Sequence, residues 1–249
     1  MARYQVILAY DGTDFYGSQR QAMGPKSRTI QASIESALRQ IGWQDRAILS
    51  AGRTDTGVHA RGQVIAFDLD WDHSPEDLRA ALNANLPLDV AVKVVNLVSS
   101  DFHPRYDALA RRYCYRIFCQ PARDPLRDRY AWRVWPPVTL EPMQEAASYL
   151  PGSHDFAAFG APPRAGGPTV RSVLKAEWQE EQDELTFEIV ANAFLFHMVR
   201  RLVGFQVSIG QGRFEPDAIC NYLDRRSSMP VKCIAPPQGL TLMEVIYFI

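Results

Sequence analysis

The order of its predicted secondary-structure elements constrains this chain most. In the first half, the spacing of apolar residues and the helix and turn signals define six elements in sequence. Strands are expected at residues 4–9, 47–50, 64–69 and 90–98, and helices at 30–41 and 74–85. Together they follow the order β-α-β-β-α-β, which is typical of a ferredoxin-like unit.

The second half predicts the same order with longer insertions. Strands are expected at residues 109–118, 173–178, 185–191 and 242–248, and helices at 141–150, 194–208 and 217–223. We therefore predict an α+β fold of two ferredoxin-like units in tandem, residues 1–104 and 105–249, with a central cleft as the ligand site. Residues 152–168 hold four glycines and three prolines and predict a mobile loop outside the core.

Composition is that of an ordinary globular protein, with 47% hydrophobic and 22% charged residues among 249. No apolar run approaches the roughly 20 residues that cross a bilayer, and the N-terminus lacks a secretory signal. We expect a cytoplasmic protein without a membrane partner. The four cysteines form no C-x-x-C pair, so we expect reduced thiols, with neither a metal nor a disulfide.

Charge is unevenly distributed along the chain. The net charge of −1 argues weakly against a nucleic-acid partner. Residues 103–133, however, hold eight arginines against three aspartates, with five tyrosines and tryptophans among them. Such a segment suits a phosphate chain with exposed bases, although a solvated arginine face is an equally good interpretation.

The densest chemical signal is the segment 51–62, between two predicted strands. It contains three glycines and the sequence Arg53-Thr54-Asp55, so a single carboxylate lies on a shaped loop beside an arginine. If their side chains meet, Arg53 would keep Asp55 ionised. An ionised aspartate can act as a nucleophile or base, whereas a purely structural Asp55 would form an Asx-type turn.

The residues Asp55-Thr56-Gly57 also match the D-T-G motif of aspartic proteases. Those enzymes need two carboxylates that share a proton. The chain has no second D-T-G, and a neighbouring guanidinium would favour full ionisation of Asp55. Only a homodimer could supply the second carboxylate, so an aspartic protease is the weaker interpretation.

Motifs along nearly the whole chain resemble the TruA family of tRNA pseudouridine synthases. They are YDGT at 10–13, GRTDTGVHA at 52–60, NANLP at 83–87, DFHPR at 101–105, ARRYCY at 110–115, GSHDF at 152–156, NAF at 192–194 with HMVR at 197–200, and APPQGL at 235–240. Each motif alone is weak, but their joint order and spacing are highly specific.

The resemblance implies that Asp55 is the nucleophile, that Tyr113 stacks on the target uracil and that Arg200 pairs with Asp55. Strand parity places Tyr113 and Tyr115 on the same face, so parity alone does not choose between them. A buried arginine on the apolar helix predicted at 194–208 needs an anionic partner; otherwise Arg200 would be exposed at the helix edge.

Two further predictions concern a helical histidine and the arginines of the basic segment. His197 lies three residues before Arg200, but a lone helical histidine is more often packed in the core than a base. From the basic segment we predict that Arg105, Arg111 and Arg112 bind RNA phosphates.

Forming pseudouridine breaks the N1–C1′ bond and joins C5 to C1′, without net electron transfer, so we expect no cofactor and no metal. A stacked uracil must first be flipped into a pocket. Asp55 could add to the base, attack C1′ or remove a sugar proton. The resemblance further implies uridines 38, 39 and 40 of the anticodon arm and a homodimer that binds tRNA across both subunits.

A non-catalytic RNA-binding protein of the same fold is the alternative, although the RNP1 pattern is absent. The sequence also departs from the family at one point. Ser18 stands where the family usually has tryptophan, and residues 21–28 look locally extended. The first loop resembles one that approaches RNA, so this departure concerns RNA contacts rather than Asp55.

Overall fold

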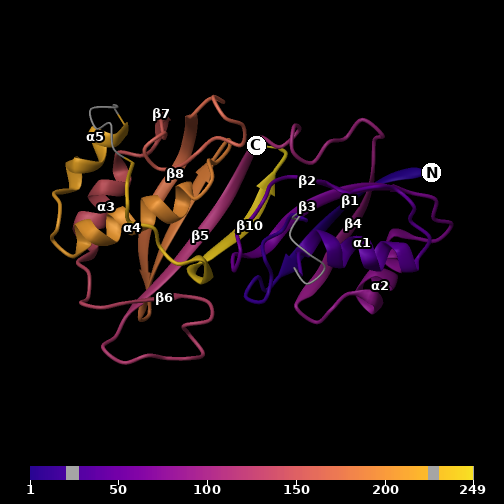
Figure 1. The fold of residues 1–249 in the computed structure, drawn as a ribbon, viewed down its shortest axis with the longest axis horizontal. Helices are drawn as coiled ribbons and strands as arrows, with labels where there is room; N and C mark the ends of the chain where they lie inside the picture. The colour runs from indigo at the N-terminus through magenta and orange to yellow at the C-terminus, as the bar shows by residue number, and fades with distance from the viewer. Residues whose placement is uncertain (21–27, 224–229, 249) are drawn as a thin grey trace. The chain divides into compact units, whose positions relative to one another are not determined.

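The computed structural model describes residues 1–20, 28–223 and 230–248 (Figure 1). The chain forms two compact units. The first comprises Met1–Leu109 with Leu242–Ile249, and the second comprises Ala110–Thr241. Apart from Arg28, the stretch 21–28 that looked locally extended lies outside the described residues. The predicted boundary between domains 1–104 and 105–249 stays a prediction.

The first unit contains the predicted β-α-β-β-α-β order. Its elements are β1 (Ala2–Tyr10), α1 (Ile30–Gln40), β2 (Leu49–Ser50), β3 (His59–Leu69), α2 (Pro75–Asn85) and β4 (Val90–Val98), with β10 (Leu240–Ile246) joining it from Leu242 on. β1 lies between β4 and β3 and is antiparallel to both. β2 and β10 are the further neighbours of β3. The α+β prediction is confirmed for this unit.

Local sequence explains why both helices of the first unit begin where they do. The Thr29 side chain accepts a hydrogen bond from the Ala32 amide at the start of α1. Ser74 and Asp77 form a reciprocal capping box at the start of α2, followed by proline in the first turn. On β1, every second side chain is buried, which is the period of a strand with one face in the core. These buried residues are Tyr4, Val6, Leu8 and Tyr10.

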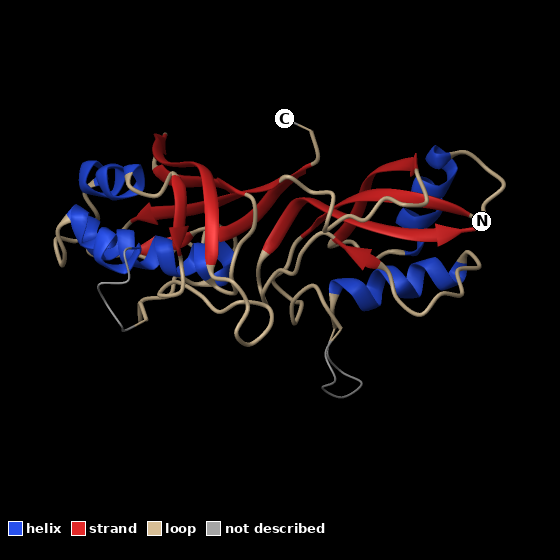
Figure 2. Ribbon diagram, turned by 90° about the horizontal axis from the view of Figure 1, so that it is seen from above, coloured by secondary structure: helices blue, strands red, loops and turns tan. Residues whose placement is uncertain are grey.

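The second unit has a four-stranded antiparallel sheet in the order β5-β9-β8-β7, and β6 pairs in parallel with β5. Its elements are β5 (Ala110–Cys119), β6 (Trp132–Val134), α3 (Leu140–Ser148), β7 (Gly152–Asp155), β8 (Val170–Glu181), β9 (Glu184–Ala191), α4 (Met198–Gly210), η1 (Pro216–Ile219), α5 (Cys220–Leu223) and η2 (Pro237–Gly239). In Figure 2, blue helices flank the red strands.

Side-chain hydrogen bonds tie the helices of the second unit to its sheet. The indole of Trp178 on β8 donates to Gln206 of α4, and Gln144 of α3 donates to the Trp178 carbonyl. Trp178 and Gln206 are both buried, so each polar group finds its partner inside the core. Among the described residues, no helix has the length and apolar character needed to cross a membrane.

Two expectations for the second unit are corrected. The helix expected from residue 194 begins at Met198, because the Phe196 amide donates to the Ala161 carbonyl and His197 has a left-handed backbone with φ +64°. The expected loop at 152–168 begins with β7. It also buries Phe156 and Phe159 completely, so part of it belongs to the core.

Candidate active site

Asp55 lies in the loop between β2 and β3, residues 51–58, which we call the carboxylate loop. The Ala51 amide donates to the Val64 carbonyl at 2.9 Å, and the Val58 amide donates to the Asp55 carbonyl at 3.2 Å. Gly57 has φ +78°, a conformation that favours glycine. The loop is therefore closed by its own turn and anchored on β3, and it leaves Asp55 half-buried.

Thr54, the residue before Asp55, has each of its polar groups hydrogen-bonded. Its amide donates to Ser18 Oγ at 2.8 Å, and its carbonyl accepts from the Ser18 amide at 3.1 Å. Its hydroxyl shares a 2.8 Å hydrogen bond with the buried Tyr10 hydroxyl. Burial raises the pKa of Tyr10, so that phenol stays protonated and able to donate. Thr54 is thus fixed from two separate segments.

The segment 11–19, the first loop, packs closely against the carboxylate loop. A Cβ atom on Gly12 would lie 2.0 Å from the Val58 carbonyl oxygen, and one on Gly17 would lie 3.0 Å from the Thr54 oxygen. Gly17 also has φ +86°. The close approach requires glycine at position 12, whereas at position 17 the left-handed backbone is the main reason for glycine and the close approach adds to it.

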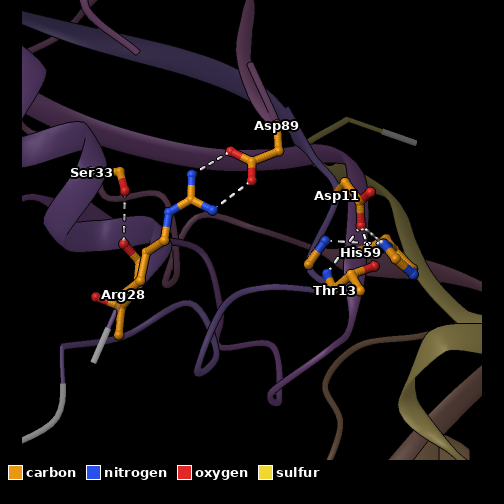
Figure 3. Close-up of polar contacts among 8 residues, drawn as sticks. Asp11, Thr13, Arg28, Ser33, His59 and Asp89 are labelled. Atoms are coloured by element: carbon orange, nitrogen blue, oxygen red, sulfur yellow. Dashed lines mark hydrogen bonds and ion pairs between the residues drawn. The ribbon is translucent and has the colours of Figure 1, made fainter. Parts of the chain in front are cut away.

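A polar cluster joins the first loop to the start of β3 (Figure 3). Asp11 Oδ1 accepts from the Thr13 amide at 3.0 Å and from the Thr13 hydroxyl at 2.6 Å. His59, the first residue of β3, is buried; its Nδ1 accepts from the Gly12 amide at 3.0 Å and lies 3.2 Å from Asp11 Oδ1. The start of the first loop and the start of β3 are therefore held together beside the carboxylate loop.

An ion pair fixes the first loop from its other side. Arg28 donates to both carboxylate oxygens of Asp89 at 2.6 and 2.7 Å, a bidentate geometry visible in Figure 3. The Arg28 guanidinium carbon also lies 4.1 Å from the centre of the Phe15 ring. Because Phe15 is buried in the first loop, these contacts connect that loop with the start of β4.

The second unit carries Tyr113, whose ring packs edge-on against Phe194 with the centres 5.0 Å apart. Arg111, two residues earlier on the same face of β5, donates to the Asn192 carbonyl at 2.8 Å. Tyr115 shares the face but is completely buried, and its hydroxyl donates to the Pro236 carbonyl at 2.7 Å. Tyr113 is only half-buried, so of the two tyrosines it is the one with surface left for a ligand.

Arg200 lies in the first turn of α4 and is half-buried. Its Nε donates to the Ala235 carbonyl at 2.8 Å, and its own carbonyl accepts from the Ala235 amide at 3.0 Å. Burial raises the pKa of Tyr115 well above its ordinary value, while the positive charge of Arg200 acts in the opposite direction.

The predicted site residues fall in both units. Asp55 and Arg53 belong to the first unit, where Arg53 is exposed, and Tyr113 and Arg200 belong to the second. The pairing of Asp55 with Arg200 stays a prediction. His197 is exposed instead of packed in the core, because its left-handed backbone places it just ahead of α4.

Several arginines of the basic segment already have acidic partners within their own unit. Arg112, on the face opposite Arg111, pairs with Glu188 at 3.1 Å. Burial alone would raise the pKa of Glu188, but hydrogen bonds from Lys175 and Arg112 outweigh it and lower the pKa. Arg116 and Arg127 pair with Glu184 at 2.7 and 3.2 Å. Less of the segment's positive charge remains for a phosphate chain than its composition suggests.

Sequence reasoning missed the residues that support the loop. Tyr10, Thr54 and Gln63 form a buried group in which Gln63 Nε2 donates to the Gly52 carbonyl at 3.2 Å. Ser18 was expected to concern RNA contacts rather than Asp55, and that expectation is corrected, because Ser18 is buried and hydrogen-bonds Thr54, the residue next to Asp55. Tyr10 and Thr54 lie inside the motifs quoted above. Their side chains are 44 residues apart in the sequence and meet only in the folded chain, so no spacing in the sequence could have indicated the contact.

No described group of three or more histidine, cysteine, aspartate or glutamate side chains is arranged to hold a metal ion. None of the four cysteines, all of which lie in the described part of the chain, forms a disulfide. Burial raises the pKa of the Cys114 thiol to about 11, which makes it a poor nucleophile at neutral pH.

In the first unit, the β2–β3 loop presents Asp55 between Gly52 and Gly57. The family model described as tRNA pseudouridine synthase matches residues 6–107 and 146–248. The chain belongs to this family.

Individual relatives match almost the whole chain. The protein named tRNA pseudouridine synthase A from Brevibacillus brevis is 39% identical over 247 residues, covering 99% of this chain and 100% of the relative. One of the same name from Halalkalibacterium halodurans is 40% identical over 242 residues, covering 96% and 90%. Among solved structures, a Cbf5-Nop10-Gar1 complex has a TM-score of only 0.36 at 12% identity, covering 82% of this chain and 45% of that chain.

Proposed function

We propose that this protein is a tRNA pseudouridine synthase that converts uridine to pseudouridine in the anticodon stem-loop, at positions 38, 39 and 40. The observation that carries this proposal is the full-length match to proteins named tRNA pseudouridine synthase A, in which the carboxylate loop lies within the matched region. The proposal includes a cytoplasmic location, which the bacterial relatives named tRNA pseudouridine synthase A support. The TruA resemblance supports a homodimer that binds tRNA across both subunits.

Asp55 is the proposed catalytic carboxylate. Asp55 is half-buried, and the residue before it, Thr54, has all its polar groups hydrogen-bonded. The backbone at Asp55 is therefore held in one position before substrate arrives. Such preorganisation is what a nucleophile or base requires. Arg53 and Arg200 are proposed to orient the carboxylate, since a guanidinium binds a carboxylate through charge-assisted hydrogen bonds.

Tyr113 is proposed to receive the flipped uracil. The structure supports Tyr113 over Tyr115, because Tyr115 is completely buried and uses its hydroxyl on Pro236. The edge contact with Phe194 orients the Tyr113 ring, and a π face is the surface on which a base stacks. The cost of flipping the nucleotide, a few kcal/mol, would be offset by this stacking and by phosphate contacts.

The reaction moves one bond and one proton. The N1–C1′ bond breaks, the uracil turns, C5 bonds to C1′, and the hydrogen on C5 leaves as a proton while N1 gains one. Asp55 serves as the nucleophile or base in this sequence. Reactants and products have the same oxidation state, so the isomerisation requires no redox partner.

Phosphate binding is assigned to Arg105, Arg111 and Arg112. Arg105 is exposed, and Arg111 lies on the face of β5 that carries Tyr113. Arg112 points to the opposite face and pairs with Glu188. This pairing supports a smaller contribution of Arg112 to phosphate binding. Each cation that neutralises a phosphate releases a counterion and strengthens binding at low salt.

The test is release of tritium from C5 of uracil in a tRNA transcript, measured after incubation with the purified protein alone. The proposal expects release that stops at about the number of target uridines per tRNA. The alternative, an RNA-binding protein without activity, expects tight tRNA binding and no release. Activity that is abolished by a chelator and restored by zinc would contradict the cofactor-free chemistry.

A further inference from the structure

Ser18 connects the start of α1 to the peptide that carries Asp55. The Ser18 carbonyl accepts from the Gln31 amide at 2.9 Å, and the neighbouring Gly17 carbonyl accepts from the Ile30 amide at 3.4 Å. These two amides belong to the first turn of α1. Ser18 is therefore fixed to α1 by hydrogen bonds that are separate from its contacts with the carboxylate loop.

From that position Ser18 bonds both peptide units that flank Thr54. Its Oγ accepts from the Thr54 amide at 2.8 Å. Its own amide donates to the Thr54 carbonyl at 3.1 Å. That carbonyl shares a planar peptide with the Asp55 amide, so the Ser18 amide fixes the plane from which the Asp55 Cα departs.

Of these two hydrogen bonds between Ser18 and Thr54, only the one to the hydroxyl depends on the side chain at position 18. Ser18 is only 8% exposed and Thr54 only 7%, so water has little access to the Thr54 amide. Without an acceptor at residue 18, a buried N–H would lack a hydrogen bond, and the loop would have to move to satisfy it. Any such movement shifts Asp55, the next residue along the chain.

We propose that Ser18 is a positioning residue for the isomerisation, acting through Thr54 to hold the Asp55 carboxylate at its reacting distance. This inference rests on the proposed function, because it assigns Asp55 the catalytic role. Ser18 itself bonds backbone atoms and does not need to touch the substrate. Loss of its hydroxyl should therefore slow the chemical step and leave tRNA binding intact.

The experiment compares Ser18→Ala, Ser18→Thr and the parent in single-turnover tritium release at saturating tRNA, together with tRNA affinity and thermal unfolding. Alanine removes the acceptor and should lower the rate by about tenfold or more, since small misplacements of a reacting group are costly. Affinity for tRNA should stay within about twofold, as no phosphate contact is lost. Threonine keeps the hydroxyl and should restore most of the rate.

Ser33→Ala is the matched control. Its hydroxyl donates to the Thr29 carbonyl at 3.2 Å at the start of the same helix and is half-buried, so it tests the loss of a serine hydrogen bond near α1 in general. A parental rate for Ser33→Ala with a slow, folded Ser18→Ala would support the inference.

Three outcomes would overturn it. In the first, Ser18→Ala releases tritium within twofold of the parent rate; in the second, a folded Ser18→Thr is as slow as Ser18→Ala. A rate loss that only follows the unfolded fraction assigns Ser18 a purely structural role and also overturns the inference. Absence of release by the parent would instead contradict the proposed function, so the two failures are distinguishable.

Discussion

Two tyrosines on one face of β5 show how surroundings separate residues of the same type. Tyr115 is completely buried, and Gly239 lies so close to it that a Cβ there would be 2.6 Å from the tyrosine ring. Tyr113 keeps part of its surface and contacts Phe194 edge-on. Strand parity predicts the shared face, but the burial of one residue and not the other depends on η2, which is distant in sequence.

Tyr115→Phe should destabilise the protein without slowing catalysis. The substitution removes the donor to the Pro236 carbonyl and keeps the ring, so the free energy of unfolding should fall by about 1 kcal/mol. Urea unfolding measures the loss and tritium release measures the rate. A variant with parental stability but a rate reduced at least tenfold would reverse the roles assigned to Tyr115 and Tyr113.

At the scale of elements, local signals predicted boundaries well where they were strong. Helix α2 begins behind a capping box at Ser74, and the apolar spacing of β4 gave its bounds, Val90–Val98, to the residue. The predicted start of α4 was wrong because its apolar pattern continues into residues 194–197, although Phe196 in that stretch pairs its backbone with Ala161. Such contacts are tertiary and leave no local pattern.

The pairing of β1 with β3 carries a pH-dependent contribution to stability. Arg3 donates to both oxygens of Asp68 at 2.8 and 2.7 Å across these strands. These hydrogen bonds lower the pKa of Asp68, although burial acts against them. A lowered pKa in the folded state means that the contribution is present above about pH 4 and is lost as the pH falls through the lowered value.

Asp68→Asn should therefore reduce the free energy of unfolding by roughly 1 kcal/mol at pH 7, a modest value because the pair is partly exposed. The difference from the parent should begin to shrink as the pH falls below about 4. Urea unfolding at pH 7, 5 and 3 measures it, with the exposed Asp45→Asn as the control. A difference that is constant or grows as the pH falls would contradict this account.

At the scale of the whole molecule, the sequence predicted the family but only part of how its charge is used. The excess of arginines at residues 103–133 is visible in the sequence. Their partners are not, because Glu184 and Glu188 lie on β9, about 70 residues further along the chain. Likewise, the sequence identified Asp55 through its motif, while the support from Tyr10 and Ser18 depends on the folded chain.

Salt dependence should separate the two adjacent arginines of β5. Arg111→Ala should reduce the slope of log tRNA affinity against log salt by about one unit per lost phosphate contact. Arg112→Ala is the matched control and should change the slope less, because Arg112 is already paired with Glu188. Equal slopes for the parent and Arg111→Ala would exclude Arg111 from the phosphate contacts.

The central claim is that Asp55 performs the chemistry, and Asp55→Asn tests it most directly. Asparagine is nearly isosteric but is neither an anionic nucleophile nor a base, so tritium release should fall by about a thousandfold or more while tRNA affinity and thermal unfolding stay parental. Arg200→Ala should lose most activity, and the double variant should be scarcely slower than Asp55→Asn, because residues that act as a unit are not additive. Release by Asp55→Asn at even a tenth of the parental rate would contradict the account.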